Sequence, residues 1–290
     1  MYDVAIIGAG PAGLSAALYT SRAGLSTLVI GKDGGALAKA ELIENYFGMP
    51  APISGCELVE NAKNQARTLG ADLAEDEVLG ISWAGSFRIA CREEAFEARA
   101  VILATGASRK KGKIQGLSEH EGKGVSYCAV CDAFFYRGKT VAVLGHGEYA
   151  LHELSQLLPV AGECILCTDG QEPEGQVPEG VRVEKARILG IEGEDLVEAV
   201  AFADGSRIPV SGVFVALGSA GAVDLARKIG VPVENNRIVV DEKMATNIPG
   251  LFAAGDCIGG LLQISTAVGE GAQAGMSAIA YVRRNRQKTD

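Results

Sequence analysis

Short apolar runs alternate with glycine-rich turns along the chain, and the first of them opens a familiar pattern. The run Val4 to Ile7 leads into the glycine-rich segment Gly8 to Gly13, which has the spacing GxGxxG. An alanine-rich stretch to Ala23 and a second apolar run, Thr27 to Ile30, follow. This pattern predicts a strand, a tight turn, a helix and a second strand, the context that a dinucleotide-binding fingerprint requires.

The same order returns in the middle of the chain. The apolar run 141–144 leads into Gly145 to Ala150, then into a predicted helix through Leu158 and a strand at 164–167. Two further apolar runs, at 101–106 and 213–218, each end at glycine and are suited to close the sheet of their own unit. The chain therefore predicts an α/β fold with two Rossmann-like domains related by internal repetition.

The C-terminal part carries one more strand and one helix. The segment Gly250 to Asp256 is an apolar strand running into a turn, and small residues from about Thr266 to Tyr281 predict a helix. We expect this part to return to the first domain. Polar and charged residues at 107–113 and 235–243 predict the linkers.

Composition and charge narrow the class of protein. Lys and Arg number 27 against 36 Asp and Glu, which gives a net charge of −9 and argues against a nucleic-acid partner. Apolar stretches fall short of the roughly 18 residues of a membrane helix, and the start of the chain enters a strand directly. We therefore expect a cytoplasmic protein without a membrane partner. The 38 glycines, about twice the usual share, suit tight turns and close approach to a cofactor.

The strongest chemical signal is the CxxC sequence at Cys128 and Cys131, followed directly by Asp132. Two cysteines at this spacing can form a redox-active disulfide, and a neighbouring acid can supply the proton that thiolate exchange needs. The alternatives are two unrelated buried thiols and a zinc site, which would need a second pair of ligands. Cys164 and Cys167 share the spacing, but a predicted strand holds them, so we interpret that pair as structural. We give the same interpretation to Cys56, Cys91 and Cys257.

The second fingerprint is a poor match to a nucleotide site. No Lys or Arg occurs from Thr140 to Val181, whereas this window holds seven acids, and the 2′-phosphate of NADPH needs Arg partners. We therefore exclude NADPH. Asp169 lies near the offset of a ribose-binding acid and leaves NADH open. His146, Glu148 and Tyr149 add bulk and negative charge where a pyrophosphate would bind.

The order of five motifs resembles that of the low-molecular-weight thioredoxin reductases. These motifs are the first fingerprint, the ATG at 104–106, the CxxC with Asp132, the second fingerprint and the GD at 255–256. The resemblance implies the class II architecture of pyridine-nucleotide-disulfide oxidoreductases, with two three-layer ββα domains. It also implies an FAD-binding domain at 1–112 and 242–290, a central domain at 113–241 that carries the CxxC, and a homodimer that reduces thioredoxin.

By the same resemblance, Cys131 lies nearest the flavin, Cys128 attacks the partner disulfide and Asp132 acts as general acid. The stretch 43–48, with Asn45, and the later Asp256 and Gln263 match family residues beside the flavin. The resemblance implies an FAD site built from Gly8, Gly10, Pro11, Ala12, Gly13, Asn45, Ala104, Thr105, Gly106, Gly255, Asp256, Gln263 and Ile264.

The stretches 127–136, 147–153 and 263–271 are most similar to the ferredoxin-dependent flavin thioredoxin reductases. We therefore hypothesise that the enzyme is a thioredoxin-disulfide reductase whose donor is ferredoxin. Deazaflavin- or NADH-dependent reduction and a redox sensor without turnover stay open. An acidic ferredoxin would need a basic docking surface, and we expect it at 109–113 or at the C-terminal cluster 283–288.

Overall fold

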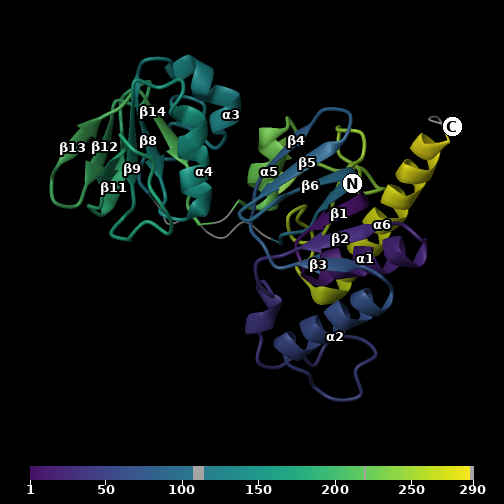
Figure 1. The fold of residues 1–290 in the computed structure, drawn as a ribbon. Helices are drawn as coiled ribbons and strands as arrows, with labels where there is room; N and C mark the ends of the chain where they lie inside the picture. Colours follow the sequence, from purple (N-terminus) through teal and green to yellow (C-terminus); the bar gives the residue numbers. More distant parts are fainter. Residues whose placement is uncertain (107–113, 219, 288–290) are drawn as a thin grey trace. The chain divides into compact units, whose positions relative to one another are not determined.

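The computed structural model describes residues 1–106, 114–218 and 220–287 of the chain. The chain divides into two compact units, which are described separately (Figure 1). Unit 1 comprises Met1–Arg109 and Gly221–Asp290, and unit 2 comprises Lys110–Ala220. No helix among the described residues has the length and apolar character needed to cross a membrane.

Unit 1 is built on a seven-stranded sheet in the order β3-β2-β1-β6-β5-β4, with β17 paired to β6 beside this path. The parallel strands β1, β2 and β17 and the second half of β6 carry the apolar runs read from the sequence and are buried, as central parallel strands usually are, whereas the edge strand β3 is partly exposed. An antiparallel hairpin, β4 and β5, extends the sheet from β6. The strands are β1 (Tyr2–Ile7), β2 (Thr27–Ile30), β3 (Asp72–Ala74), β4 (Val78–Trp83), β5 (Phe87–Cys91), β6 (Ala95–Leu103) and β17 (Leu251–Ala253).

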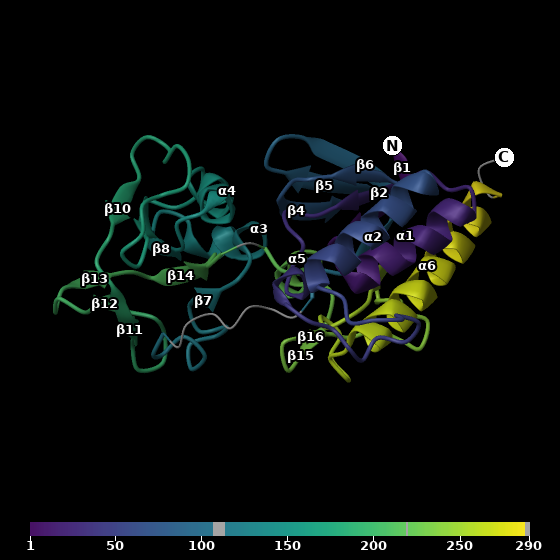
Figure 2. The same ribbon diagram turned by 90° about the horizontal axis from the view of Figure 1, so that it is seen from below.

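Two helices of unit 1, α1 (Pro11–Arg22) and α6 (Ile264–Arg286), lie side by side (Figure 2). Small residues allow this close packing, since a Cβ added to Gly271 would lie 2.1 Å from the carbonyl oxygen of Ala12. At the far end of α6, the Arg286 guanidinium binds the buried carboxylate of Asp3. The last helix is therefore tied to the first strand.

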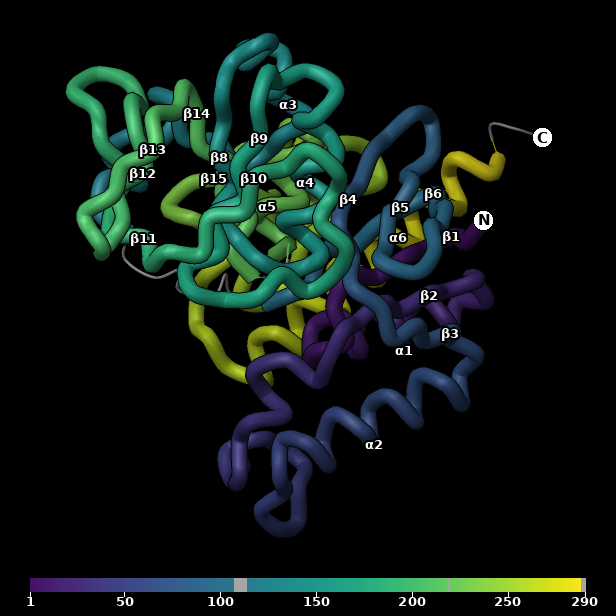
Figure 3. The backbone as a smooth tube through the Cα atoms, turned by 60° about the vertical axis from the view of Figure 1, so that its left-hand side comes forward, coloured from purple at the N-terminus to yellow at the C-terminus, as the bar shows by residue number. Residues whose placement is uncertain are grey.

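The remaining elements of unit 1 are short apart from α2 (Gly55–Thr68), which Ser54 caps by accepting a hydrogen bond from Glu57 N at 3.1 Å. The segment between β2 and α2 projects away from the sheet (Figure 1 and Figure 3) and includes the single 3₁₀ turn η1 (Leu37–Lys39). The other elements are α5 (Ala222–Lys228), β15 (Val233–Glu234) and β16 (Arg237–Ile238).

Unit 2 has a five-stranded parallel sheet in the order β10-β9-β8-β14-β7. Helix α4 packs against its strands, and a three-stranded antiparallel sheet shares a core with it through Val200, Phe202 and Val213. The parallel strands are β7 (Val125–Ser126), β8 (Thr140–Leu144), β9 (Glu163–Cys167), β10 (Arg182–Glu184) and β14 (Gly212–Val215). The other elements are α3 (Ala129–Asp132), η2 (Ala133–Tyr136), α4 (Glu148–Leu157), β11 (Ile188–Glu192), β12 (Ala199–Phe202) and β13 (Arg207–Pro209).

The two units repeat one arrangement, as the sequence predicts. In unit 1, β6 pairs in parallel with β1, the strand that leads into the fingerprint, and in unit 2, β14 pairs in parallel with β8, the strand that leads into the second fingerprint. The predicted α/β fold with two Rossmann-like sheets is confirmed. Cys164 and Cys167 lie buried in β9 with free thiols, whose pKa values burial raises to about 11 and about 12.

The chain re-enters unit 1 at Gly221, earlier than the expected domain boundary at 242. The physical reason is that α5 packs on β4, where Lys228 Nζ donates to the carbonyl oxygen of Leu79 at 3.0 Å. The segment 221–241 therefore belongs with unit 1, although polar residues at 235–243 suggested a linker there.

Candidate functional site

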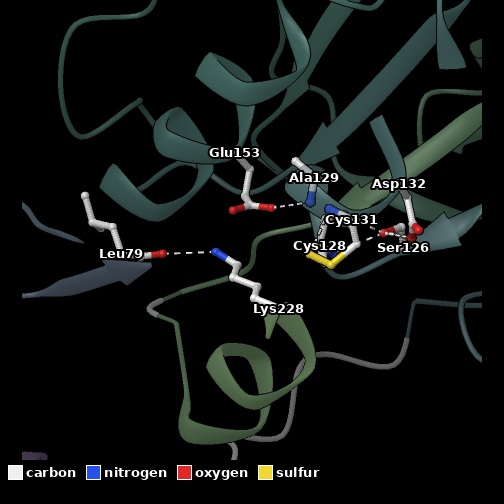
Figure 4. The surroundings of a disulfide bond; sticks show 8 residues. All are labelled: Leu79, Ser126, Cys128, Ala129, Cys131, Asp132, Glu153 and Lys228. Atoms are coloured by element: carbon white, nitrogen blue, oxygen red, sulfur yellow. Dashed lines mark hydrogen bonds between the residues drawn. A yellow bond between two sulfur atoms is a disulfide. The ribbon is translucent and has the colours of Figure 1, made fainter. Parts of the chain in front are cut away.

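Cys128 and Cys131 are joined by a disulfide in unit 2 (Figure 4). Cys128 directly precedes the short helix α3, and its Sγ accepts a hydrogen bond from Cys131 N at 3.1 Å. Cys128 is buried, with 5% of its surface exposed, whereas Cys131 is exposed. The two cysteine residues therefore differ in exposure.

Ser126 connects the disulfide to Asp132, and sequence reasoning missed it. The hydroxyl of Ser126 donates to Asp132 Oδ2 at 2.7 Å and accepts from Cys128 N at 3.0 Å. Ser126 is itself buried at the end of β7, so its hydroxyl holds the carboxylate and the first cysteine in one network. The only sequence signal is a hydroxyl residue two positions before the first cysteine.

Glu153 is the second residue that sequence reasoning missed at this site. It lies on α4 with 1% of its surface exposed, and its Oε2 accepts from the amide of Ala129 at 2.8 Å (Figure 4). From the sequence, Glu153 counted as one of the acids unfavourable to a phosphate and as the last residue of the stretch 147–153, with no role at the disulfide. The structure instead places its carboxylate under the CxxC turn, because helix α4 packs against α3.

A cavity of about 860 Å³ opens beside the CxxC turn, and both Ser126 and Asp132 line it. Lys123 and Lys139 also line it, and neither forms an ion pair with any residue that the structure describes. Burial raises the pKa of Tyr136 in its wall, and the charge of Asp132 adds to the effect. Three apolar side chains near the disulfide stand in solvent: Val130, Phe134 and Phe135.

The second fingerprint is covered by the chain itself. The amide of Glu174 donates to the carbonyl oxygen of His146 at 2.7 Å, and a Cβ on Gly147 would lie 3.3 Å from Glu174 Oε2. A Cβ on the next residue, Gly175, would lie 2.8 Å from Glu148 Oε1. The segment after β9 therefore lies over the turn where a pyrophosphate would have to bind.

Asp169, the candidate ribose-binding acid of this unit, is also engaged by its own chain. Its Oδ1 accepts from the amide of Ile188 at 2.7 Å, and its backbone has a positive φ of 52°. The carboxylate therefore fixes the start of β11, which is a structural role.

The first fingerprint has a different geometry. A Cβ on Gly8 would lie 2.2 Å from the carbonyl oxygen of Ala104, and one on Gly13 would lie 1.9 Å from that of Gly8, so both glycines serve close packing. A Cβ on Gly10 would meet nothing within 4 Å. Gly10 precedes α1, and Pro11 begins it with no side-chain cap. The open backbone at this turn fits the pyrophosphate of a dinucleotide.

The other expected flavin residues of unit 1 gather around the start of α1 and α6. A Cβ on Gly255 would lie 2.9 Å from Ala12 Cβ, so the GD turn packs on α1. Glu270 of α6 accepts from Gly255 N at 2.9 Å. Desolvation raises the pKa values of both Asp256 and Glu270, and the charge of Asp256 contributes to the shift of Glu270. Sequence reasoning missed Glu270.

Two more contacts involve the expected flavin residues. Asn45 Nδ2 donates to Gln263 Oε1 at 3.2 Å, which joins the stretch 43–48 to the start of α6. Thr105 Oγ1 accepts from the amide of Ala222 at 2.6 Å, which engages Thr105 with α5. Ile264 and Pro11 line one apolar pocket of about 210 Å³, and Gly106 has a positive φ of 76°.

The chain matches the family model described as pyridine nucleotide-disulphide oxidoreductase over residues 2–164 and 176–271. It is 36% identical to the thioredoxin reductase of Listeria innocua, over 99% of this chain and 96% of that protein. The unmatched residues 165–175 include the segment that covers the second fingerprint.

Two solved structures are similar in fold as well as in sequence. The atypical thioredoxin reductase TRi from Desulfovibrio vulgaris Hildenborough superposes with a TM-score of 0.93 at 43% identity, covering 98% of this chain and 99% of that chain. A ferredoxin-flavin thioredoxin reductase from Clostridium acetobutylicum has a TM-score of 0.72 at 33% identity, covering 98% of each chain.

Proposed function

Since this chain belongs to the low-molecular-weight thioredoxin reductase family, we propose that it reduces thioredoxin through FAD and the Cys128–Cys131 disulfide, with ferredoxin as donor. The observation that carries the choice of donor is the covered second fingerprint, where Glu174 lies against His146 and Gly147. A pyridine nucleotide would have to displace this segment, and its phosphates would meet carboxylates without a paired cation.

The members of this family are FAD-dependent flavoenzymes, which supports the proposal that unit 1 binds FAD. FAD, when bound, accepts electrons singly and releases them as a pair. The open backbone at Gly10 would receive the pyrophosphate, with Gly8, Pro11, Ala12 and Gly13 shaping the turn. Further residues proposed to line the cofactor are Asn45, Ala104, Thr105, Gly106, Gly255, Asp256, Gln263 and Ile264.

The two cysteines take different roles in this proposal. Cys131 is exposed, which supports its assignment as the sulfur that faces the flavin. Cys128, freed when the disulfide opens, attacks the disulfide of thioredoxin, and a mixed disulfide forms before the oxidised pair is restored. Asp132 holds the proton that the departing thiolate of thioredoxin takes up, and the Ser126 hydroxyl orients its carboxylate.

The surroundings of the disulfide support a protein acceptor. Val130, Phe134 and Phe135 expose apolar surface beside the active cysteines, and the Arg137 guanidinium lies 5.5 Å from the centre of the Phe134 ring. Exposed aromatic residues with a cation among them are typical of protein interfaces. The cavity next to them admits solvent to Asp132, which therefore can regain its proton between turnovers.

The two basic clusters considered for ferredoxin fare differently. Residues 109–113 lie outside the described residues, as does Lys288 of the C-terminal cluster. In that second cluster, Arg286 binds Asp3 and Arg283 donates to the carbonyl oxygen of Ala23 at 3.1 Å, so both have structural tasks. The exposed Arg237, which packs on the Gly259 backbone just before Gln263, forms no ion pair with a described residue and is a third candidate.

A homodimer is part of the proposal. Unit 1 exposes Leu42, Phe47 and Met49 on the segment before α2, and Phe47 is 97% exposed. Apolar side chains of this size in solvent suggest that another surface covers them. Sedimentation of the FAD-loaded protein at micromolar concentration tests for the homodimer, and a monomer would reject it.

The decisive experiment follows flavin absorbance anaerobically after separate additions of NADPH, NADH, reduced deazaflavin and reduced ferredoxin. We expect bleaching by ferredoxin, reversal by thioredoxin, and no bleaching by either nucleotide. The variant Cys128→Ser is the control, because its flavin should still bleach while thioredoxin no longer restores the colour. Rapid bleaching by NADH would reject ferredoxin as the donor, and bleaching by reduced deazaflavin alone would make deazaflavin the donor. Bleaching that thioredoxin does not reverse would indicate a redox sensor without turnover.

A further inference from the structure

We propose that Glu153 is a positioning residue that keeps the reduced Cys128/Cys131 pair a strong reductant. The proposal rests on the redox role of this disulfide, and it is independent of the electron donor. Glu153 lies one peptide unit from Cys128, since its Oε2 accepts from the amide of Ala129, the next residue in the chain, at 2.8 Å. It comes from α4, the helix that follows the covered second fingerprint.

The position of Glu153 is unusual for a carboxylate. Only 1% of the residue is exposed, and acidic side chains are rarely buried to this extent without a partner that needs them. One such partner is the backbone between the two cysteines, through the Ala129 amide. The helix that follows a nucleotide fingerprint thus carries, in this chain, a buried acid directed at the CxxC turn.

The chemical consequence concerns the reduced state. When the disulfide takes up two electrons and one proton, the S–S bond breaks and leaves one thiol and one thiolate. Backbone amides near the sulfurs can stabilise that thiolate, and Cys131 N already donates to Cys128 Sγ at 3.1 Å. The amide of Ala129 is withheld from this task because Glu153 binds it.

A buried negative charge one peptide unit away adds to this effect, because like charges disfavour the thiolate. Destabilising the thiolate destabilises the reduced pair, and a less stable reduced pair passes its electrons on more readily. Glu153 therefore biases the couple towards reducing its acceptor, and it holds the CxxC turn in place at the same time.

The test equilibrates the FAD-loaded protein with graded ratios of reduced and oxidised dithiothreitol, traps thiols with an alkylating reagent and measures the peptide containing both cysteines by mass. Glu153→Gln keeps an oxygen for the Ala129 amide and removes the charge, so at a pH where the reduced pair carries one thiolate we expect the equilibrium constant to shift about tenfold towards the reduced pair, or about 30 mV. Glu153→Ala should shift at least as far. Glu153→Asp keeps the charge and should shift less than threefold.

The matched control is Glu163→Gln, which removes an exposed charge from β9 of the same unit and should leave the equilibrium unchanged. Equal equilibrium constants for wild type, Glu153→Gln and Glu153→Ala would overturn the proposal. Equal shifts in all three Glu153 variants would also overturn it, since they would indicate loss of structure without a role for the charge. If Glu153→Gln does not fold, the comparison of Glu153→Ala with Glu153→Asp decides by the same criterion.

Discussion

The amide of Glu174 donates a 2.7 Å hydrogen bond to the carbonyl oxygen of His146, which places a loop of unit 2 directly on the turn of its own fingerprint. In unit 1 the equivalent turn is open at Gly10. Two turns of related sequence thus differ in whether a ligand can reach their backbone. The difference lies in the segment after the second strand of each repeat, and not in the glycines themselves.

Alanine substitutions at equivalent glycines should separate the two turns. Gly10→Ala adds a Cβ that meets no atom of the described residues within 4 Å, so the protein should fold normally, but the methyl group would enter the space proposed for the pyrophosphate. We expect FAD retention to fall roughly tenfold or more, measured as flavin bound after gel filtration. Gly147→Ala meets the end of the flexible Glu174 side chain at 3.3 Å and, at an ordinary contact distance of 3.7 Å, the carbonyl oxygen of Gly218, so it should retain full flavin. Equal retention in both variants would refute the assignment of the open turn.

Asp132→Asn should slow thioredoxin reduction by about 100-fold at neutral pH, because general acids contribute effects of this order. The amide still accepts from Ser126, so the fold and the flavin should be unaffected. Stopped-flow reduction of thioredoxin by the prereduced enzyme gives the rate.

The matched variant Ser126→Ala leaves the buried Cys128 amide without its acceptor, and we expect the free energy of unfolding to fall by about 1–3 kcal/mol. If Asp132→Asn reduces thioredoxin as fast as the wild type does, another group supplies the proton to the departing thiolate of thioredoxin.

The raised pKa values of Asp256 and Glu270 predict how the FAD-free protein responds to pH. A carboxyl whose pKa is higher in the folded state binds more protons when folded, so stability falls as pH rises from the ordinary value, 3.8 for Asp256 or 4.5 for Glu270, through the folded one. Glu270→Gln keeps an acceptor for Gly255 N and removes one charge. Urea unfolding between about pH 4 and pH 7 should show a smaller loss of stability in this variant. An unchanged profile would remove Glu270 from the explanation.

Thiol labelling of the native, oxidised protein should discriminate among the free cysteines. Burial raises the pKa of Cys257 and of Cys167 to about 12, so both stay protonated and shielded at pH 8. Cys56 is exposed on α2 and should react within minutes with iodoacetamide. Peptide mass analysis after quenching measures each site. Labelling of Cys257 at the rate of Cys56 would show that the core of unit 1 opens readily.

Much of the fold follows from local patterns. Apolar runs ending at glycine mark β1, β6, β8 and β14, because a strand buried on both faces needs such a run and its turn needs glycine. The boundary of unit 2 could not be found in this way. It depends on α5 packing against β4, a contact between segments far apart in the chain.

The candidate site divides in the same manner. The CxxC and Asp132 can be identified from the sequence, because disulfide formation between nearby cysteines requires a short spacing and the acid follows directly. The structure joins the two cysteines in a disulfide. Glu153 and Ser126 act through hydrogen bonds to the backbone, for which any buried acceptor in the right place would serve. No spacing rule identifies such residues. The covering of the second fingerprint by Glu174 is likewise a tertiary contact and could not be predicted from the sequence. The seven acids between Thr140 and Val181 nevertheless indicated that this fingerprint is a poor match to a nucleotide site.

The hydrogen bond from Ala222 to Thr105 brings together the points at which the chain leaves and re-enters unit 1. Unit 2 is therefore an insertion whose two ends start from neighbouring positions, while Asp3 and Arg286 hold the outer ends of the host sheet and helix. A domain inserted in this way can be exchanged or deleted without changing the fold of unit 1, since a short loop can join the neighbouring positions at which the chain leaves and re-enters it. Unit 1 and unit 2 are thus separable modules, and selection can change one of them while leaving the other intact.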